Sequence, residues 1–296
     1  MGLCGENEVW SLLQKYGFKF SKSMGQNFLI DPGIPEKIVK MSGIDETCGV
    51  IEVGPGAGAL TVALCRFAKF VLAIELDRRL LPVLNESLSG FENVEVISGD
   101  ILKIDIASLA KNKMPGLRRH ACSNLPYNIT SPAIISLIGS GVFEAITVMV
   151  QKEVARRICA APGSQDYGAF TVFINYHCSE QKVLFDVPPE CFMPRPGVIS
   201  SVVIMRTRES KLLGLEDEKA FFKVVRAAFG QRRKTLLNAL YSVYCDLLKK
   251  DDIAEIIRFC GLDTSIRGEK LGLSEFIELA RHMSQKYPCA DGRSCS

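Results

Sequence analysis

The feature that most constrains the fold is an alternation of short apolar runs with helical patterns along the first half of the chain. Each run is four to six residues long and ends at or beside a glycine or a polar residue. The runs are residues 50–54, 70–75, 94–97, 120–123 and 146–150. Residues 59–67 and 78–88 have helical spacing, with Pro82 expected in a first turn. Because apolar strands joined by helices form a parallel sheet covered on both faces, we expect an α/β fold.

The pattern changes in the second half of the chain. Residues 170–178 and 198–205 resemble strands with no helical segment between them, so we expect an antiparallel pair at the sheet edge. The proline-rich connection at residues 187–196 is expected to lack regular structure. Helical spacing then takes over, in residues 221–229, 232–248, 253–260 and 274–282. We therefore predict one α/β domain over residues 1–207, a small all-α domain over 208–290, and a disordered tail at 291–296.

Composition limits the possible partners and cofactors. Hydrophobic residues make up 47% and charged residues 23%, and the net charge of +3 requires any nucleic-acid site to be a local basic cluster. The 11 cysteines form no C-x-x-C pair and the three histidines are scattered, so we expect no metal site and reduced thiols. The sequence has no secretion signal and no membrane-spanning run, which predicts a cytoplasmic protein without a membrane partner. We expect a monomer.

A glycine-rich turn follows the first strand and precedes a helix, at Gly54-Pro55-Gly56-Ala57-Gly58. Such a turn lets the backbone approach a ligand, although a tight turn without a ligand has the same composition. Glu75 ends the second strand and Asp100 follows the third, where they can reach a ribose and an adenine amine. These features predict an adenosine-containing cofactor. The glycine spacing differs from the G-x-G-x-x-G of nicotinamide cofactors, but that difference alone does not exclude them.

The fourth strand is followed by Asn124-Leu125-Pro126-Tyr127. In amino methyltransferases, an Asn or Asp before an apolar residue, proline and an aromatic residue holds the target nitrogen. The Asn124 side-chain oxygen and the Leu125 carbonyl can accept both hydrogens of an adenine amine and thereby aim its lone pair. Tyr127 can stack on a flipped base, and Pro126 stiffens the turn. The alternative is a loop in which Asn124 caps a helix and Tyr127 packs.

These motifs together resemble those of the ribosomal RNA adenine dimethyltransferase family, and the resemblance extends along nearly the whole chain. It rests on residues 23–31 (SMGQNFLID), 54–56 (GPG), 75–77 (ELD), 99–100 (GD), 124–128 (NLPYN), 192–198 (FMPRPGV) and 229–236 (FGQRRKTL). It implies a Rossmann-like class I methyltransferase domain with a mostly parallel seven-stranded sheet and an antiparallel edge strand. The small helical domain is then expected to bind RNA or the ribosome.

The resemblance also implies the cofactor and the substrate. S-adenosylmethionine is expected to contact Asn27, Leu29, Gly54, Gly56, Glu75, Asp100 and Asn124. Phe192 is expected to form a second aromatic wall for the adenine. The substrate implied is two neighbouring adenosines in a hairpin loop near the 3′ end of small-subunit ribosomal RNA, each methylated twice during ribosome biogenesis, with the small subunit as the partner.

Basic residues gather in two segments that can reach RNA phosphates. Lys22 lies in an N-terminal stretch with Lys15 and Lys19, among aromatic residues, and Arg232, Arg233 and Lys234 precede a helix of the second domain. A run of three basic residues is more often a solvated face, and only the family resemblance favours an RNA-binding role for these.

Three other functions share part of this pattern. A large-subunit adenine dimethyltransferase of the antibiotic-resistance type shares the cofactor loop, but the N-L-P-Y-N form and the long helical region favour the small subunit. A non-catalytic ribosome assembly factor has no need of intact Asn124, Pro126 and Tyr127. A DNA adenine methyltransferase usually has Asp at the position of Asn124 and an added target-recognition domain.

Overall fold

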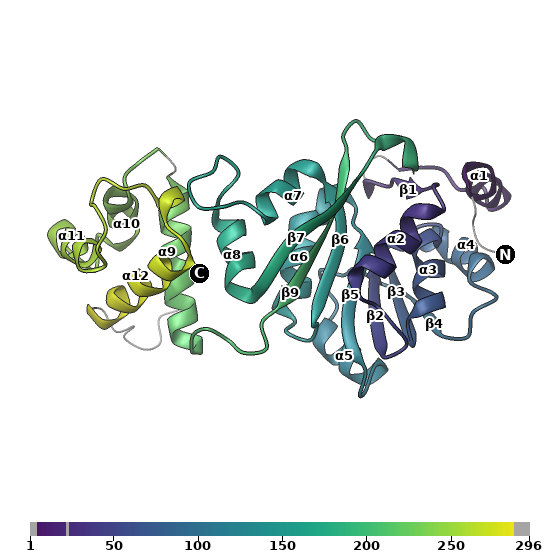
Figure 1. The fold of residues 1–296 in the computed structure, drawn as a ribbon, viewed down its shortest axis with the longest axis horizontal. Coiled ribbons are helices and arrows are strands. Elements are labelled where there is room, and N and C mark those ends of the chain that lie inside the picture. Colours follow the sequence, from purple (N-terminus) through teal and green to yellow (C-terminus); the bar gives the residue numbers. More distant parts are fainter. Residues whose placement is uncertain (1–4, 22–23, 232, 287–296) are drawn as a thin grey trace. The chain divides into compact units, whose positions relative to one another are not determined.

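The computed structural model describes residues 5–21, 24–231 and 233–286, which fall into two compact units (Figure 1). The sheet unit comprises Met1–Ala155 and Cys178–Glu209, and the helical unit comprises Arg156–His177 and Ser210–Ser296. The sequence predicted a single boundary near residue 208. Residues 156–177 group with the later helices because Tyr167, Val172 and Tyr176 lie in the same buried cluster as those helices.

The sheet unit is built on seven strands in the order β4-β3-β2-β5-β6-β9-β7. The strands are β2 (Cys48–Val53), β3 (Phe70–Glu75), β4 (Val94–Ser98), β5 (Arg118–Asn124), β6 (Ala145–Gln151), β7 (Cys178–Val187) and β9 (Ser200–Thr207). Strands β2 to β6 pair in parallel, and β9 is antiparallel to both β6 and β7. The expected mostly parallel sheet is therefore confirmed, with the antiparallel strand one position in from the edge.

Helices cover both faces of this sheet (Figure 1). They are α2 (Gly33–Ser42), α3 (Ala59–Phe67), α4 (Leu81–Ser87), α5 (Ile106–Lys113) and α6 (Thr130–Gly139), and α1 (Glu6–Lys15) precedes them. Helix α7 (Lys152–Ile158) follows β6, and the division between the two units falls within it. Strand β2 is buried along its whole length, as expected of a central parallel strand. The expected helix at residues 59–67 is confirmed, and Pro82 lies in the first turn of α4, where its missing N–H costs no hydrogen bond.

A two-stranded sheet adds the N-terminal segment to this unit. Strand β1 (Phe28–Leu29) pairs antiparallel with β8 (Phe192–Met193), so Leu29 lies opposite Phe192. The proline-rich connection expected to lack regular structure contains this short strand and one 3-10 turn, η4 (Pro189–Cys191).

The prediction of a strand at residues 170–178 is wrong. These residues form helix α8 (Ala169–His177), and the strand that pairs with β9 is β7. The β-branched and aromatic residues of this segment favour a strand locally, but tertiary packing overrides that weak preference. Val172 and Tyr176, four residues apart, enter the helical unit's core, and the Thr171 hydroxyl donates to the Arg157 carbonyl oxygen at 2.7 Å.

The helical unit continues with α9 (Leu215–Gly230), α10 (Leu236–Tyr244), α11 (Lys250–Phe259) and α12 (Leu273–Lys286). Each overlaps a segment for which the sequence showed helical spacing, but α10 is shorter than the predicted 232–248 segment. Fully buried Phe221 and Phe276 anchor its core. The Thr235 side chain accepts from the Asn238 N–H and caps α10, while at the start of α11 the Asp252 carboxylate accepts from the Lys249 N–H at 3.1 Å.

The described part of the chain contains neither a membrane-spanning helix nor a metal-binding cluster. No described helix is both long enough and apolar enough to cross a membrane. No group of three or more His, Cys, Asp or Glu side chains among the described residues could hold a metal ion. The predicted tail at 291–296 lies outside the described residues.

His120 is a buried ionisable group in the centre of the sheet. It is 1% exposed, and neither ring nitrogen has a hydrogen-bond partner among the described residues. Burial lowers its pKa from 6.5 to about 4, with the nearby Arg118 charge adding to the effect. The unfolded chain therefore binds a proton between these pH values that the folded chain does not.

We predict that His120 makes the protein less stable in acid. The free energy of unfolding is unaffected by this group above pH 6.5. As the pH falls from 6.5 toward 4, the unfolded chain gains a proton on His120 and the free energy of unfolding decreases by up to about 3 kcal/mol. The variant His120→Leu should lose much less stability over the same range. Urea unfolding at several pH values measures this, and equal acid sensitivity of the two proteins would contradict it.

Candidate active site

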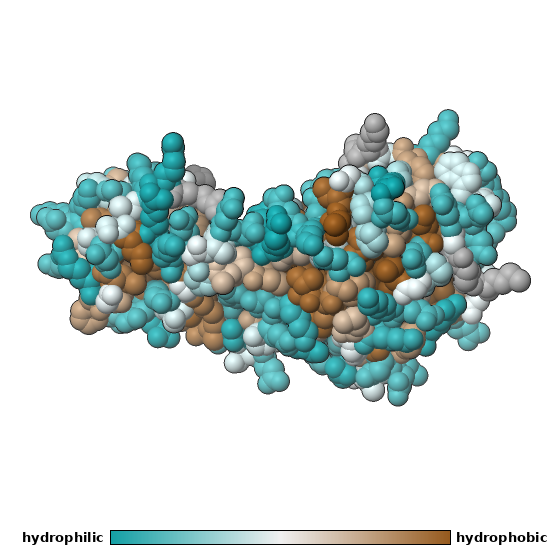
Figure 2. Space-filling model, turned by 45° about the horizontal axis from the view of Figure 1, so that its top comes forward, coloured by the Kyte–Doolittle hydropathy of each residue, from teal (hydrophilic) through white to brown (hydrophobic). Residues whose placement is uncertain are grey.

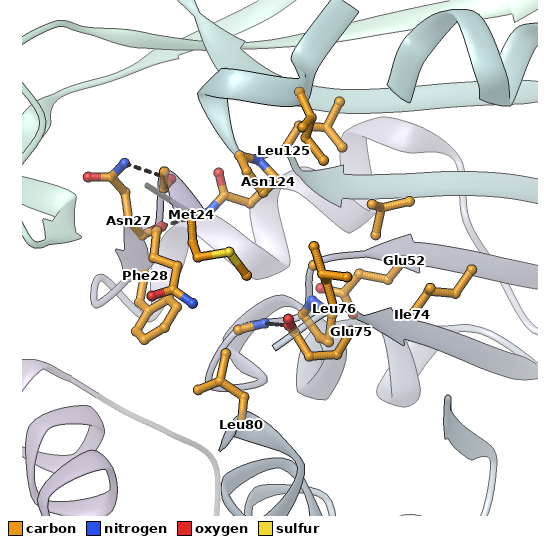
Figure 3. Close-up of a pocket in the computed structure, with 18 of the residues that line it drawn as sticks. Met24, Asn27, Phe28, Glu52, Ile74, Glu75, Leu76, Leu80, Asn124 and Leu125 are labelled. Carbon is orange, nitrogen blue, oxygen red and sulfur yellow. Dashed lines mark hydrogen bonds between the residues drawn. The ribbon is translucent and has the colours of Figure 1, made fainter. Parts of the chain in front are cut away.

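Backbone hydrogen bonds hold the carboxyl ends of three strands side by side. Gly54 follows β2, and its N–H donates to the carbonyl oxygen of Ile74 in β3 at 2.9 Å. Gly99 follows β4, and its N–H donates to the carbonyl oxygen of Glu75 in β3 at 2.9 Å. The Val53 N–H donates to the Ser123 hydroxyl of β5 at 2.9 Å. Residues that follow β2, β3, β4 and β5 therefore line one pocket, together with residues 24–29 (Figure 3).

The glycine turn gives the pocket an open backbone floor. Gly54 and Gly56 have φ values of 67° and 62°, in the left-handed region that favours glycine. A Cβ atom on Gly56 would come within 2.9 Å of the Phe28 ring, and one on Gly54 would lie 3.5 Å from Pro126. The turn can therefore pass closely beneath both the N-terminal segment and the loop after β5.

Two carboxylates, each followed by an apolar residue, lie along the pocket. Glu75 is 5% exposed, and its carboxylate accepts from the N–H groups of Gly56 at 3.3 Å and Asp77 at 2.7 Å. Asp100 is half-buried and accepts from the Leu102 N–H at 3.0 Å. Leu76 and Ile101, the residues after these carboxylates, also line the pocket. Hydroxyl-binding oxygens beside apolar side chains fit the ribose and ring of a purine nucleoside.

Glu52, near the end of β2, is a pocket residue that the sequence analysis missed. It is 1% exposed, and its Oε2 has no hydrogen-bond partner among the described residues. Burial raises the pKa of Glu52 to about 8 and that of Glu75 to about 7. The signal in the sequence was an acidic residue inside an otherwise apolar strand.

The N-terminal segment closes one side of the pocket and is tied to the end of β3. Gln26 donates to Asp77 at 2.9 Å, and Asp77 also pairs with Arg79 at 2.6 Å. Figure 3 shows Met24 and Phe28 reaching into the pocket from this segment. Asn27, Leu29, Gly54, Gly56, Glu75, Asp100 and Asn124, predicted as cofactor contacts, all line this one pocket.

Asn124, the last residue of β5, has a defined amide orientation. Its Nδ2 donates to the Asn27 carbonyl oxygen at 3.0 Å (Figure 3). Since a carbonyl oxygen only accepts, the nitrogen must be the atom that faces Asn27, and Oδ1 must be on the other side of the amide. Oδ1 accepts no hydrogen bond from any described residue. The site thus presents a fixed acceptor to a ligand that carries an N–H group.

The loop after β5 is held from two sides. The Leu125 N–H donates to the Met149 carbonyl oxygen at 3.2 Å, and the Thr130 hydroxyl donates to that of Pro126 at 3.1 Å. The Tyr127 hydroxyl lies 2.7 Å from that of Ser200, which is fully buried at the start of β9. Leu125, Pro126 and Tyr127 all line the pocket, as the sequence predicted for a site at this loop.

Phe192 differs from the other predicted site residues in its surroundings. It is 3% exposed and packs in the hydrophobic core beside Leu29 and Cys191, and it does not line the pocket. Its neighbour Met193 packs against the separate cluster that contains Phe28. The structure therefore places Phe192 one layer behind the pocket.

Two of the predicted RNA-binding residues, Arg233 and Lys234, lie far from the pocket residues in sequence, whereas Lys22 lies just before the N-terminal pocket segment. Arg233 and Lys234 are exposed between α9 and α10. Lys22 and Arg232 lie outside the described residues. Lys15 pairs with Glu86 at 2.5 Å, so its charge is already partly compensated.

Sequence comparisons place the chain among ribosomal RNA enzymes. The profile of the ribosomal RNA adenine dimethylase family matches residues 17–254. A ribosomal RNA small subunit methyltransferase A from Clostridioides difficile (strain 630) is 43% identical over 285 residues, which are 96% of this chain and 98% of that relative. A protein of the same name from Geobacillus thermodenitrificans (strain NG80-2) is 45% identical over 272 residues, 91% of this chain and 92% of that relative.

Solved structures share the fold. A dimethyladenosine transferase from Plasmodium falciparum superposes with a TM-score of 0.73 at 28% identity, covering 88% of this chain and 98% of that chain. A 23S rRNA methyltransferase, ErmE, superposes with a TM-score of 0.66 at 24% identity, covering 87% of this chain and 100% of that chain. The second likeness concerns the fold alone.

We predict that binding of S-adenosylmethionine is pH-dependent through Glu75. Ribose hydroxyls donate to the ionised carboxylate and so favour it over the protonated form, whereas burial raises the pKa of Glu75 to about 7. Affinity should therefore increase as the pH rises toward about 7, by at most about tenfold per unit, and then level off.

The variant Glu75→Gln should bind more weakly and lose this pH dependence, while Glu52→Gln should retain it. Isothermal titration calorimetry across the pH range measures both effects. If Glu75→Gln kept the wild-type pH profile, another group would be responsible.

Proposed function

This chain belongs to the ribosomal RNA adenine dimethylase family, and on that premise we propose that it dimethylates adenines of small-subunit ribosomal RNA with methyl groups from S-adenosylmethionine. The relatives that are 43% and 45% identical along more than nine-tenths of the chain are small-subunit methyltransferases. The likeness to a 23S rRNA methyltransferase, at 24% identity, supports no more than a common fold.

The finer substrate assignment goes beyond the names of these relatives. We assign the reaction to the N6 amines of two adjacent adenosines in the 3′-terminal hairpin loop, each methylated twice, during ribosome biogenesis. The match of the N-L-P-Y-N and basic F-G-Q-R-R-K-T-L motifs supports this assignment. The monomeric state and the cytoplasmic location stay predictions.

The pocket residues fit the cofactor. The left-handed Gly54 and Gly56 leave room for a close approach, Glu75 and Asp100 are placed for hydroxyl and amine groups, and Leu76 and Ile101 supply apolar contacts. S-adenosylmethionine supplies an electrophilic methyl group on a sulfonium sulfur. Phe28 and Met24 cover the pocket from the N-terminal segment and so help to exclude water.

The single observation that carries the proposal is the orientation of the Asn124 amide. An adenine amine is a poor nucleophile because its lone pair is delocalised into the ring. With Nδ2 held by the Asn27 carbonyl, Oδ1 is available to accept one hydrogen of that amine, and the Leu125 carbonyl is assigned to the other. This grip favours a more tetrahedral nitrogen with its lone pair directed along one line.

Tyr127 supplies the face on which the target base stacks. The adenine must leave its RNA stack to enter the pocket, and an aromatic ring compensates part of that cost. The hydrogen bond to buried Ser200 fixes where the Tyr127 ring lies. Phe192 becomes a second wall only if β8 moves, since its side chain is now in the core. The base-contact role of Tyr127 therefore has more support than that of Phe192.

The alternative of a non-catalytic assembly factor is less well supported. A protein that only binds RNA has no need of an acceptor oriented in a buried pocket beside a nucleoside site. Asn124, with its fixed amide, is the group that such a factor would be free to lose. The same enzyme can still act as a checkpoint on the immature subunit.

We predict that Asn124→Ala lowers the rate of methyl transfer by about a hundredfold or more, while S-adenosylmethionine and RNA binding largely survive, because the other pocket residues remain. Transfer of tritiated methyl groups to small subunits that lack the modification measures the rate, and mass spectrometry of the labelled fragment locates the base. Normal transfer by this variant would exclude the proposed grip. Wild-type labelling confined to large subunits would reject the substrate.

Asn124→Asp provides a sharper test of the same hydrogen bond. An ionised aspartate cannot donate to the Asn27 carbonyl oxygen, whereas a protonated one can and still presents an acceptor. The activity of Asn124→Asp relative to wild type should therefore rise as the pH falls, by at most about tenfold per unit. A pH profile parallel to that of the wild type would show that this orientation does not matter.

A further inference from the structure

A basic groove lies between α9 and α10 of the helical unit, away from the pocket in sequence. Its walls include Lys223 and Arg226 of α9 and Ser242 of α10, with Gly230 and Gln231 at the end of α9. Lys223 and Arg226 are three residues apart, so they lie on the same side of the helix. None of these residues was among the RNA contacts predicted from the sequence.

The two positive charges of the groove lack acidic partners. Neither Lys223 nor Arg226 forms an ion pair with any described residue. By contrast, Lys219, one turn earlier on the same helix, pairs with Glu216 at 2.8 Å. The Lys223 ammonium lies 4.6 Å from the centre of the Tyr244 ring, which holds it in place without neutralising it. The groove therefore has two uncompensated charges in a region where another lysine is compensated.

The groove also has room and hydrogen-bonding groups. A Cβ atom on Gly230 would meet nothing within 4 Å, so the backbone there is open. Gln231 donates to the Ser242 hydroxyl at 3.2 Å, and Ser242 donates to the Ala239 carbonyl oxygen at 2.7 Å. The Oε1 atom of Gln231 is buried and accepts no hydrogen bond from any described residue.

We propose that this groove binds the sugar–phosphate backbone of the RNA, with a phosphate between Lys223 and Arg226. The assignment rests on the proposed function, and it extends the RNA contact from Arg233 and Lys234 back onto α9. These segments are continuous, since the Lys234 N–H donates to the Gln231 carbonyl oxygen at 2.9 Å. Phosphate contacts of this kind set affinity and register, and they do not read sequence.

The two uncompensated cations of the groove favour a polyanion over a protein partner, and its hydrogen-bonding groups favour RNA. Figure 2 shows hydrophilic residues around a smaller hydrophobic patch on this face of the helical unit. The oxygens of a phosphodiester only accept hydrogen bonds, so they cannot satisfy Gln231 Oε1. Each phosphate of RNA has a ribose hydroxyl nearby that can donate a hydrogen bond.

The test compares charge-matched variants of the full chain. Lys223→Gln and Arg226→Gln each remove one positive charge from the groove. Lys219→Gln serves as the control. It removes one positive charge from the same helix, but that charge is already compensated by Glu216. Binding to small ribosomal subunits that lack the modification is measured over a range of potassium chloride concentrations. Thermal unfolding and S-adenosylmethionine binding verify that the variants are intact.

Each groove variant should bind about fivefold to tenfold more weakly at low salt, and the slope of log affinity against log salt should become shallower by about 0.7–0.9. The control should keep the wild-type slope. Slopes equal to that of the control, or an affinity loss without a slope change, would overturn the proposal. So would a slope change seen with intact particles but not with protein-free small-subunit RNA, because a ribosomal protein would then be the partner.

The outcome is separable from that of the proposed function. Methyl transfer by the wild-type enzyme to the same particles tests the function alone. If the wild type transfers methyl groups and the groove variants behave like Lys219→Gln, only the assignment of the groove fails.

Discussion

Parallel pairing of neighbouring strands determines where this molecule can do chemistry. Because β2, β3, β4 and β5 run in the same direction, their carboxyl ends meet along one edge of the sheet. Main-chain hydrogen bonds from Gly54 and Gly99 to the neighbouring strand then hold the strand ends level. The glycine turn, the two carboxylates and Asn124 come from distant parts of the sequence, and only this sheet brings them together in one pocket.

The N-terminal segment completes what the sheet begins. The same few residues cover the nucleoside pocket through Phe28 and orient Asn124 through the Asn27 carbonyl. Asp77 ties this segment to the end of β3 through Gln26, immediately beside Glu75. The N-terminal segment therefore supports both the pocket and the Asn124 amide, so in the proposed reaction cofactor binding and the hold on the target amine depend on one segment.

Much of this arrangement could be predicted from the sequence because its signals are local. The strand at residues 70–75 and the helix at 59–67 have the predicted bounds, since apolar runs and glycine turns define them. The predicted cofactor positions lie together because strand ends in parallel sheets must do so. The family motifs predicted the cofactor and the substrate class, and the role of the loop after β5 stays a prediction.

The features that could not be predicted depend on tertiary contacts. Residues 170–178 have the composition of a strand, yet they form a helix because Val172 and Tyr176 complete a core supplied by helices later in the chain. The burial of Phe192 behind the pocket and the pairing of Tyr127 with Ser200 also require the fold. The absence of acidic partners for Lys223 and Arg226 among the described residues also requires the fold, since no sequence pattern shows which basic side chains are paired.

The partner of the Asn124 amide is a main-chain atom, and this has an evolutionary consequence. Every amino acid at position 27 carries the same carbonyl oxygen, so no point mutation there can delete the acceptor outright. The orientation of the reactive amide is thereby insulated from drift in its neighbour's side chain. Position 27 can adapt its side chain to the cofactor while the geometry of the amine grip is inherited unchanged.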